Sequence, residues 1–420
     1  MITQTQYHAI LDALEQVLPF TQPADVCLSR LFREQKKLGA RDRAVIAETV
    51  FGLLRALPKL EWLAGEYAGP RMWLLCYFAA IEKRNLKEMA SIFNEEQLER
   101  ARLWKAVDWQ SAPLHVRAGL PAWIAEALQA EGRSEDEIVA LGSAMLSAAP
   151  LDLRVNLLKA KRDTVLAALN ESELKTEATP YSPWGLRLAG KPALNKHPLF
   201  LDGSIEVQDE GSQLLALLTG AKRGQMVADF CAGAGGKTLA LGAMMQNTGR
   251  LYAFDISEKR LSNLKPRLAR SGLSNVQPQL LASEHDQKVK RLAGKMDAVL
   301  VDAPCSGLGT LRRNPDLKYR QSAQSVAELN AKQASILASA ARLVKAGGRL
   351  VYATCSVLRS ENQAIVDAFL AAHPEFTLLD ASELLAKDKI TLPLAGPLLQ
   401  LDPRQHGTDG FFAAVLQRQS

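Results

Sequence analysis

Hydrophobic positions in the first third of the chain recur at helical spacing. Apolar residues return every three to four positions in HAILDALEQVL (8–18), DVCLSRLFREQ (25–35) and RDRAVIAETVFGLLRAL (41–57). Turn-forming pairs such as Gly69-Pro70 separate the segments, and no strand-like alternation of any length appears. The pattern predicts an all-helical domain over residues 1–140.

The pattern is mixed in the next part of the chain. LDLRVNLL (151–158) is typical of a short strand and RDTVLAALN (162–170) of a helix. The stretch 179–194 is rich in turn residues and holds one possible strand. We therefore expect a small α+β segment over residues 141–205.

From residue 206 to 420, short apolar runs alternate with helical patterns. Strand, helix and strand repeated in this way predict an α/β fold with a doubly wound parallel sheet that is covered on both faces. Pro266 falls inside one helical pattern, where we expect a kink or a break. The predicted strands are MVADF (226–230), LYAFD (251–255), VQPQLL (276–281), AVLVD (298–302) and RLVYAT (349–354).

A glycine-rich turn follows the first of these runs. In DFCAGAGGKT (229–238), the residues Gly233, Gly235 and Gly236 allow the backbone to turn tightly and to approach a ligand. Asp255 ends the second run, where an acid can accept both hydroxyl groups of a ribose. The combination suits an NAD-type or an adenosylmethionine-type ligand, whereas the spacing does not match a Walker phosphate loop.

Two cysteines follow two later strands directly. DAVLVDAPCSGLG places Asp302 and Cys305 just after the fourth run, and GGRLVYATCSV places Cys355 just after the fifth. Ligands of doubly wound sheets bind at the carboxyl ends of the strands, so these side chains are expected to face one crevice. A cysteine kept only for packing would more naturally lie within a strand or on a helix face.

One reaction uses all of these groups. Carbon 5 of cytosine is a poor nucleophile, but a thiolate added to carbon 6 turns the ring into an enamine that attacks a methyl donor. A carboxylic acid at N3 would stabilise the adduct, and a base must then remove the proton from carbon 5. Asp302 and Cys305 suit these last two tasks, and Lys237, Arg312 and Arg313 are candidates for the positive field that favours a thiolate.

Basic residues cluster in two places. LRRNPDLKYR (311–320) follows the Cys305 motif, and its cations, with Tyr319 as a stacking ring, suit a nucleic acid backbone. A second cluster lies in the helical front, where an ordinary solvated helix face is an equally good interpretation. Candidate RNA contacts are Arg312, Arg313, Lys318, Arg41 and Arg43.

Composition narrows the function classes. The net charge of +6 permits a polyanionic partner without requiring one. The five cysteines include no CxxC pair, so we expect neither a disulfide framework nor a metal site. No apolar stretch is long enough for a membrane helix, and the first residues do not resemble a signal peptide, so we expect a cytoplasmic protein without membrane contact. A monomer is favoured.

Together the motifs resemble the RsmB/NOP/Sun family of RNA cytosine-5 methyltransferases. The most specific pair is APCSG with ATCS in this order. The helical front, with LGARDRAVIAETVFGLLR (38–55), is similar to the NusB-type RNA-binding domain that precedes the catalytic domain in RsmB-like members. The other matching segments are APLDLRVN (149–156), VQDEGSQL (207–214), CAGAGGKT (231–238), AFDIS (253–257), DAPCSGLGTLRRNPDLK (302–318), LVYATCSVLRSEN (350–362) and DGFFAA (409–414).

The resemblance implies a Rossmann-like class I methyltransferase sheet in residues 206–420 and S-adenosylmethionine as the cofactor. It implies that Cys355 is the nucleophile, that Cys305 assists product release, and that Asp302 holds the base and lines the cofactor site. The implied substrate is a cytosine in small-subunit (16S) ribosomal RNA. The implied cofactor-binding residues are Cys231, Ala232, Gly233, Ala234, Gly235, Gly236, Lys237, Asp255 and Asp302.

The chain departs from the family pattern in two places. Gly233 and Ala234 replace the usual Ala-Pro pair of the turn, which should loosen it slightly. After the third strand, Ala282 or Ser283 stands where the family usually has an Asp that contacts the adenine end, and Glu284 or Asp286 is a candidate substitute.

Three other functions would fit parts of the pattern. A DNA cytosine-5 methyltransferase would use Cys305 as the nucleophile, but ATCS and the RNA-binding front argue against it. A catalytically inactive RNA-binding ribosome-assembly factor would not need both cysteines and Asp302. An NAD-dependent dehydrogenase would explain the turn and Asp255 but leave both cysteines without a role.

Overall fold

The computed structural model describes residues 2–419, and the chain divides into two compact units. The first holds the residues up to Ala148 together with Thr310–Ser325, and the second holds Ala149–Gly309 together with the residues from Val326 onward. The second unit thus contains both the small α+β segment and the large sheet. The expected division at residues 140 and 205 stays a prediction.

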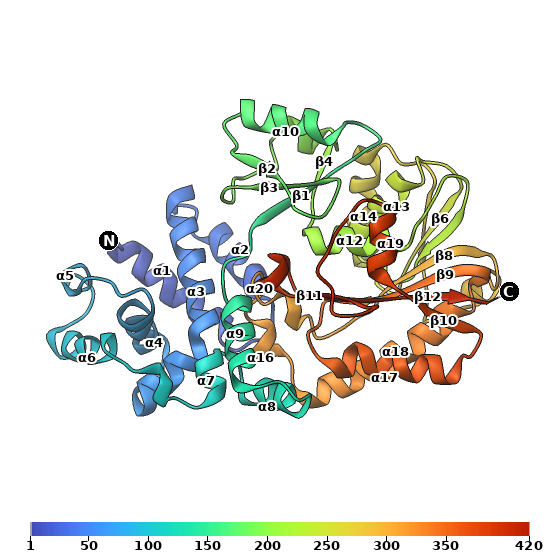
Figure 1. Ribbon diagram of the computed structural model, residues 1–420. Coiled ribbons are helices and arrows are strands. Elements are labelled where there is room, and N and C mark those ends of the chain that lie inside the picture. The colour runs from blue at the N-terminus through green and yellow to red at the C-terminus, as the bar shows by residue number, and fades with distance from the viewer. Residues whose placement is uncertain (1, 420) are drawn as a thin grey trace. The chain divides into compact units, whose positions relative to one another are not determined.

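The first unit is helical, as the 3.6-residue periodicity predicts (Figure 1). Its α-helices are α1 (Gln4–Val17), α2 (Ala24–Glu34), α3 (Ala40–Ala64), α4 (Pro70–Cys76), α5 (Leu86–Met89), α6 (Glu95–Lys105), α7 (Leu114–Ala118), α8 (Ala122–Ala130), α9 (Glu135–Met145) and α16 (Leu317–Arg320). The apolar faces of α1 to α6 form one core that includes Leu14, Leu53 and Phe78, all at most 1% exposed. α1 begins with a capping box between Thr3 and Gln6, which satisfies orphan N–H groups of the first turn.

The segment Thr310–Ser325 joins this helical unit although it follows Ala149–Gly309 of the second unit in sequence. Asp316 accepts a hydrogen bond from the N–H of Ala24 at the start of α2, at 3.3 Å. Tyr319 stacks on Phe20 with ring centroids 4.7 Å apart. The loop that follows the Cys305 motif is therefore part of the helical core rather than a free surface loop.

The second unit begins with a small antiparallel sheet and two short helices. The elements are β1 (Leu151–Val155), α10 (Arg162–Glu171), β2 (Thr176–Ala178), β3 (Gly185–Leu188), α11 (Pro198–Leu201) and β4 (Ile205–Val207). The strand order is β2-β3-β1-β4, and one face of the sheet packs under α10, with Leu153, Val165 and Leu186 in the shared core. Glu206 on the edge strand β4 forms ion pairs with Arg267 and Arg270 of the next part of the unit.

The large sheet is built from the remaining strands. They are β5 (Met226–Asp229), β6 (Arg250–Asp255), β7 (Val276–Leu280), β8 (Met296–Asp302), β9 (Val344–Thr354), β10 (Phe376–Leu379), β11 (Leu399–Leu401) and β12 (Phe411–Arg418). The order is β10-β12-β9-β8-β5-β6-β7, and β11 pairs with β12. The strands from β9 to β7 pair in parallel, whereas β12 runs antiparallel to its neighbours. This confirms the predicted doubly wound sheet, with β5 among its inner strands.

Helices cover both faces of the sheet, as Figure 1 shows. They are α12 (Glu210–Leu218), α13 (Gly236–Met244), α14 (Glu258–Ser271), α15 (Gln287–Lys290), α17 (Ala323–Ala341), α18 (Gln363–Ala372) and α19 (Ala381–Lys387). The short helix α20 (Pro403–His406) lies between β11 and β12 in the chain. Because strand side chains alternate, Val227 belongs to the core that includes residues of α12, α13 and α19, whereas Ala228 belongs to the core that includes residues of α17 and α18. α14 continues through Pro266, so the expected break there is wrong.

Candidate active site

The chain leaves the inner strand β5 toward β6 on one side and returns to β8 on the other, which creates a switch point at the carboxyl ends of these strands. Three contacts bridge the loops at this edge. Asp255 accepts a hydrogen bond from Gly233 N, Lys237 pairs with Asp302, and Cys305 contacts Cys355. The cofactor and catalytic residues predicted from the sequence therefore meet at one edge of the sheet.

The glycine-rich turn has the backbone form that its sequence predicts. Gly233 and Gly235 adopt left-handed φ angles of +56° and +85°, and a Cβ atom on Gly235 would lie 2.1 Å from Leu264 Cδ1. The amide of Gly233 donates to Asp255 Oδ2 at 2.8 Å. α13 then begins without a side-chain cap, so amide groups of its first turn face the turn. This is a cradle for the polar parts of a ligand.

Asp229, the last residue of β5, is bonded to the first turn of α13. Its side chain is buried, and its Oδ2 accepts a hydrogen bond from Thr238 Oγ1 at 2.7 Å. The buried Oδ1 atom has no hydrogen-bond partner among the described residues. Burial raises the pKa of this carboxyl group to about 7. A buried acceptor left unmatched beneath a glycine cradle fits a site that takes a polar ligand.

Lys237 and Asp302 form an ion pair that spans the loops after β5 and β8. Lys237 Nζ lies 2.7 Å from Asp302 Oδ2. Burial lowers the pKa of Lys237, but the charge and hydrogen bond of Asp302 outweigh it and the net pKa is raised. The lysine therefore keeps its positive charge, while the side chain of Asp302 is still 30% exposed.

Cys305 and Cys355 lie side by side with their Sγ atoms 3.4 Å apart, and both are half-buried. The contact with Cys355, reinforced by burial and by the negative charge of Glu361, raises the pKa of Cys305 well above its usual value. Lys237 interacts electrostatically with Cys355. The raised pKa favours the protonated thiol of Cys305.

The other cysteines lie in different surroundings. Burial and three nearby carboxyl groups raise the pKa of Cys231 well above its ordinary value, so its contribution to the turn is that of a protonated thiol. Cys27 and Cys76 are buried in the helical unit, and burial raises the pKa of Cys76 to about 12.

The predicted RNA contacts differ in their exposure. Arg41 is exposed and Arg313 is half-buried, while Arg43 donates from Nε to the carbonyl of Leu38 at 3.0 Å. Lys318 is completely buried, and its ammonium group donates to the carbonyl oxygens of Arg55 and Gly119 at 2.7 and 2.8 Å. The expectation of an RNA contact is therefore wrong for Lys318, because the ammonium group is occupied inside the helical unit.

Arg312 belongs to the same buried segment. Its side chain is only 6% exposed, and its carbonyl oxygen accepts a hydrogen bond from Arg55 Nη2 at 3.2 Å. Of the five predicted contacts, Arg41 therefore offers the most accessible charge, with Arg313 and Arg43 partly covered.

Glu284 and Asp286, the candidates for the adenine contact after β7, form hydrogen bonds with other residues of the protein. Asp286 Oδ2 accepts a hydrogen bond from Ala282 N at 2.9 Å, and Glu284 Oε1 accepts one from Ser335 Oγ at 2.7 Å. Both carboxyl groups therefore shape this loop, and whether either contacts a cofactor stays a prediction.

Sequence reasoning missed two residues that hold the site. Arg267 donates to the carbonyl of Ala234 in the glycine turn at 2.7 Å while pairing with Glu206. Glu361 is fully buried behind both cysteines. Arg267 has no local sequence signal, and the only signal for Glu361 is its place in the SEN end of the Cys355 motif.

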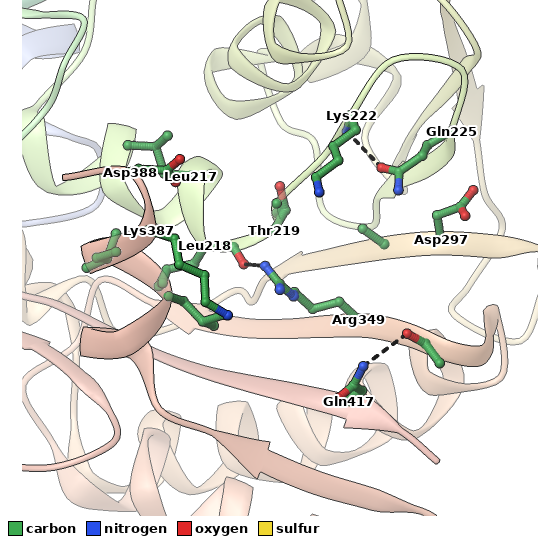
Figure 2. A pocket seen from close by; sticks show the side chains of 15 residues that line it. Leu217, Leu218, Thr219, Lys222, Gln225, Asp297, Arg349, Lys387, Asp388 and Gln417 are labelled. Carbon is green, nitrogen blue, oxygen red and sulfur yellow. Dashed lines mark hydrogen bonds between the residues drawn. The ribbon is translucent and has the colours of Figure 1, made fainter. Parts of the chain in front are cut away.

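A cavity of about 290 Å³ lies at the opposite, amino-terminal edge of β5, β8 and β9 (Figure 2). Its basic residues Lys222, Arg349 and Lys387 are matched by the acidic Asp297 and Asp388. Arg349 Nη1 is bound to the carbonyl of Leu218 at 2.9 Å. The cavity shares no residue with the cysteine site, so it has no part in the chemistry of that site.

Two further features are absent from residues 2–419. No group of three or more His, Cys, Asp or Glu side chains is arranged to hold a metal ion there. Among the same residues, no helix has the length and apolar character needed to cross a membrane.

Comparison with known proteins gives two family matches. Residues 216–417 match the family model for the 16S rRNA methyltransferase RsmB/F, and residues 120–195 match that for a ferredoxin-like domain of RsmF/B-like methyltransferases. The chain is 31% identical to the ribosomal RNA small subunit methyltransferase B of Yersinia pseudotuberculosis, with 96% of each chain covered.

Solved structures share the fold. The crystal structure of PH0851 superimposes with a TM-score of 0.80 at 24% identity, covering 100% of this chain and 99% of that one. A methyltransferase homologue from Pyrococcus horikoshii gives a TM-score of 0.61 at 27% identity, covering 73% of this chain and 97% of that one.

Proposed function

This chain belongs to the RsmB/F family of 16S ribosomal RNA methyltransferases, and we propose that it methylates carbon 5 of a cytosine in small-subunit ribosomal RNA. The observation that carries the proposal is the meeting of Cys355, Cys305 and the Lys237–Asp302 pair at one edge of the sheet. Methylation of an exocyclic nitrogen or of a ribose hydroxyl would need no thiol. Two adjacent thiols can supply the nucleophile and the base that cytosine C5 methylation requires.

S-adenosylmethionine supplies an electrophilic methyl group when it is bound. The turn from Cys231 to Lys237 and the carboxylate of Asp255 would hold it. The left-handed glycines let the backbone approach the ligand, and Asp255 is already fixed by the Gly233 amide so that its remaining lone pairs can accept ribose hydroxyl groups.

Cys355 is the nucleophile in this proposal. Lys237 interacts electrostatically with Cys355, and the thiol of Cys305 can donate a hydrogen bond to a Cys355 thiolate across 3.4 Å. The Cys355 thiolate adds to carbon 6 of the cytosine, and the electrons of the C5–C6 double bond move so that carbon 5 forms the bond to the methyl group.

Asp302 would hold the cytosine at N3. Its carboxyl group is oriented by the ion pair with Lys237 and is partly exposed. A proton shared between Asp302 and N3 would stabilise the electron-rich ring of the adduct. Since Asp302 ends β8 and Cys355 follows β9, two neighbouring strands fix the base relative to the nucleophile.

Cys305 would complete the reaction. Once Cys355 is bonded to carbon 6, its sulfur is a neutral thioether and no longer raises the pKa of Cys305. Cys305 can then release its proton to solvent, and its thiolate takes the proton from carbon 5. The electrons of the C5–H bond reform the C5–C6 double bond, and Cys355 leaves as a thiolate.

The experiment is methyl transfer from labelled S-adenosylmethionine to unmodified 16S ribosomal RNA, followed by nucleoside mass spectrometry. We expect the label in 5-methylcytosine, and none when Cys355→Ala replaces the wild type. Label in another nucleoside would refute the cytosine C5 assignment, and no transfer to any RNA would favour a non-catalytic assembly factor.

A further inference from the structure

Glu361 is a buried acid that the proposed reaction does not use. It ends the short 3₁₀ helix Arg359–Glu361, which follows β9, and has no exposed surface. A carboxylate removed from water is costly unless hydrogen bonds replace its hydration. The surroundings of Glu361 therefore need to supply several donors, and the identity of these donors indicates its role.

Four donors converge on this carboxylate. Oε1 accepts from Ser306 N at 2.8 Å and from Gln333 Nε2 at 3.0 Å. Oε2 accepts from the hydroxyl groups of Ser306 and Ser356. Ser306 directly follows Cys305 and Ser356 directly follows Cys355, so one side chain is bonded to the neighbours of both thiols.

The rest of the network fixes Glu361 itself. The hydroxyl group of Tyr352, in β9, donates to the carbonyl of Glu361 at 2.7 Å. Gln333, in α17, also donates to the carbonyl of Pro304 at 3.0 Å, which is the residue before Cys305. The carboxylate is therefore anchored to a strand and a helix while it holds two loops that are 50 residues apart in sequence.

We propose that Glu361 is a positioning residue that holds the two cysteine loops in register and sets the separation of their sulfur atoms. The expected effect of Glu361 on catalysis rests on the proposed function. Its effect on the spacing of the two cysteine loops does not depend on that function. Glu361 does not touch the substrate in this mechanism. It acts through Ser306 and Ser356, and its negative charge also favours the protonated state of Cys305.

Glu361→Gln is the sharpest test because it keeps the size of the side chain. The amide puts a donor where the wild type has an acceptor, so the hydroxyl groups of Ser306 and Ser356 lose the acceptor for their protons. Their oxygens already accept hydrogen bonds from the amides of Leu308 and Leu358, so both serine contacts should weaken or shift. We expect kcat to fall roughly 10- to 100-fold, as for a displacement of reacting groups by about 1 Å, with the KM for RNA and the Kd for S-adenosylhomocysteine within about threefold of wild type. Glu383→Gln, at an exposed position in α19, is the matched control and should leave all values unchanged.

A readout independent of methylation comes from phenylarsine oxide. Its trivalent arsenic binds two thiols that are held close together, forming two As–S bonds and releasing one water molecule. Because Cys305 and Cys355 are prearranged at 3.4 Å, the wild type should bind it tightly, and Cys355→Ala should lose this affinity. We expect Glu361→Gln to weaken binding by at least about 10-fold while its circular dichroism and melting cooperativity match the wild type.

Each result of these experiments either supports the positioning role of Glu361 or contradicts it. A fall in both kcat and arsenical affinity supports the positioning role. A folded Glu361→Gln protein with wild-type values of either quantity overturns it. If Glu361→Gln does not fold, Ser306→Ala and Ser356→Ala each remove one donor and are subject to the same criteria. If the wild type transfers no methyl group but binds the arsenical in a Glu361-dependent way, the proposed function fails and the geometric inference stands.

Discussion

Cys305 and Cys355 lie side by side because the strands that they follow, β8 and β9, are neighbours in the sheet. The two strands pair in parallel with Asp302 opposite Ala353, so that the chain passes the same edge of the sheet twice and places one cysteine there each time. The carbonyl of Cys355 also accepts a hydrogen bond from Gly309 N at 2.9 Å, and the amide of Gly410 donates to Gly309 O at 2.8 Å. The position of the nucleophile is thus set by backbone contacts as well as by side chains.

Gly309→Ala should displace Cys355 and lower stability. A Cβ atom at this position would lie 2.1 Å from the carbonyl oxygen of Gly410 and 2.9 Å from that of Cys355, so backbone segments have to move apart. We expect a loss of about 1–3 kcal/mol in the free energy of unfolding and a drop in kcat. Urea unfolding and initial rates measure the two effects.

Gly294→Ala is the control for that substitution. Gly294 has a positive φ of +68° but open space around its Cβ position, so Ala there bears only the backbone penalty. Equal stability losses in the two variants, with unchanged kcat for Gly309→Ala, would contradict the expected crowding at Gly309.

Asp302→Asn should reduce the rate of the chemical step. The amide has a similar shape but cannot share a proton with N3 and loses the ion pair with Lys237. We expect kcat to fall about 10²–10⁴-fold, with much smaller changes in the Kd for S-adenosylhomocysteine measured by calorimetry. Asp367→Asn, on the exposed side of α18, should behave as wild type. An Asp302→Asn enzyme that keeps its kcat would remove Asp302 from the mechanism.

Asp229→Asn should change how stability depends on pH. Burial raises the pKa of Asp229 to about 7, above that of an unfolded chain, so the folded state binds the proton more tightly. The associated stability is fully present below about pH 4 and is lost as pH rises through about 7. Relative to the Asn variant, the wild type should therefore lose stability over this window in urea unfolding. A difference between the two proteins that stays constant across the window would argue against the raised pKa.

Arg41 and Lys318 should differ in their effect on RNA binding. Arg41 is exposed, whereas Lys318 is bound to two carbonyl groups inside the helical unit. Arg41→Ala should reduce the slope of log K against log salt by about 1, as expected when one phosphate contact is lost. Lys318→Met should leave this slope unchanged, provided that the variant is folded by circular dichroism. The reverse result would restore Lys318 as an RNA contact.

The sequence predicts the parts of this protein that depend on local patterns. Short apolar runs and the glycine turn identify β5, β6 and β8, and cysteines placed directly after strands indicate the site. The late strands β10 to β12 are not predicted as part of the sheet. β11 (Leu399–Leu401) is too short to show alternation, and β12 begins with a continuous apolar run that periodicity does not assign to a strand rather than a helix.

The charge of a residue is the least reliable guide to whether it is exposed in this protein. Lys318 stands in LRRNPDLKYR, which has the composition of a solvated basic loop, yet its segment packs into the helical unit. The burial of Glu361 is equally hard to predict. Its place in the polar sequence SEN suggests an exposed acid and gives no indication of the four donors around it. Both depend on long-range contacts, such as that of Lys318 with Gly119, which no local window contains.

In the proposed mechanism Cys355 attacks the cytosine and Cys305 assists its release, and trapping with RNA that contains 5-fluorocytosine distinguishes these two roles. A base cannot remove fluorine from carbon 5 as it removes a proton, so the covalent protein–RNA adduct persists through denaturing electrophoresis. We predict an adduct with wild type and with Cys305→Ala, none with Cys355→Ala, and the crosslinked peptide of the wild type at Cys355. An adduct that forms in Cys355→Ala but not in Cys305→Ala would contradict this mechanism.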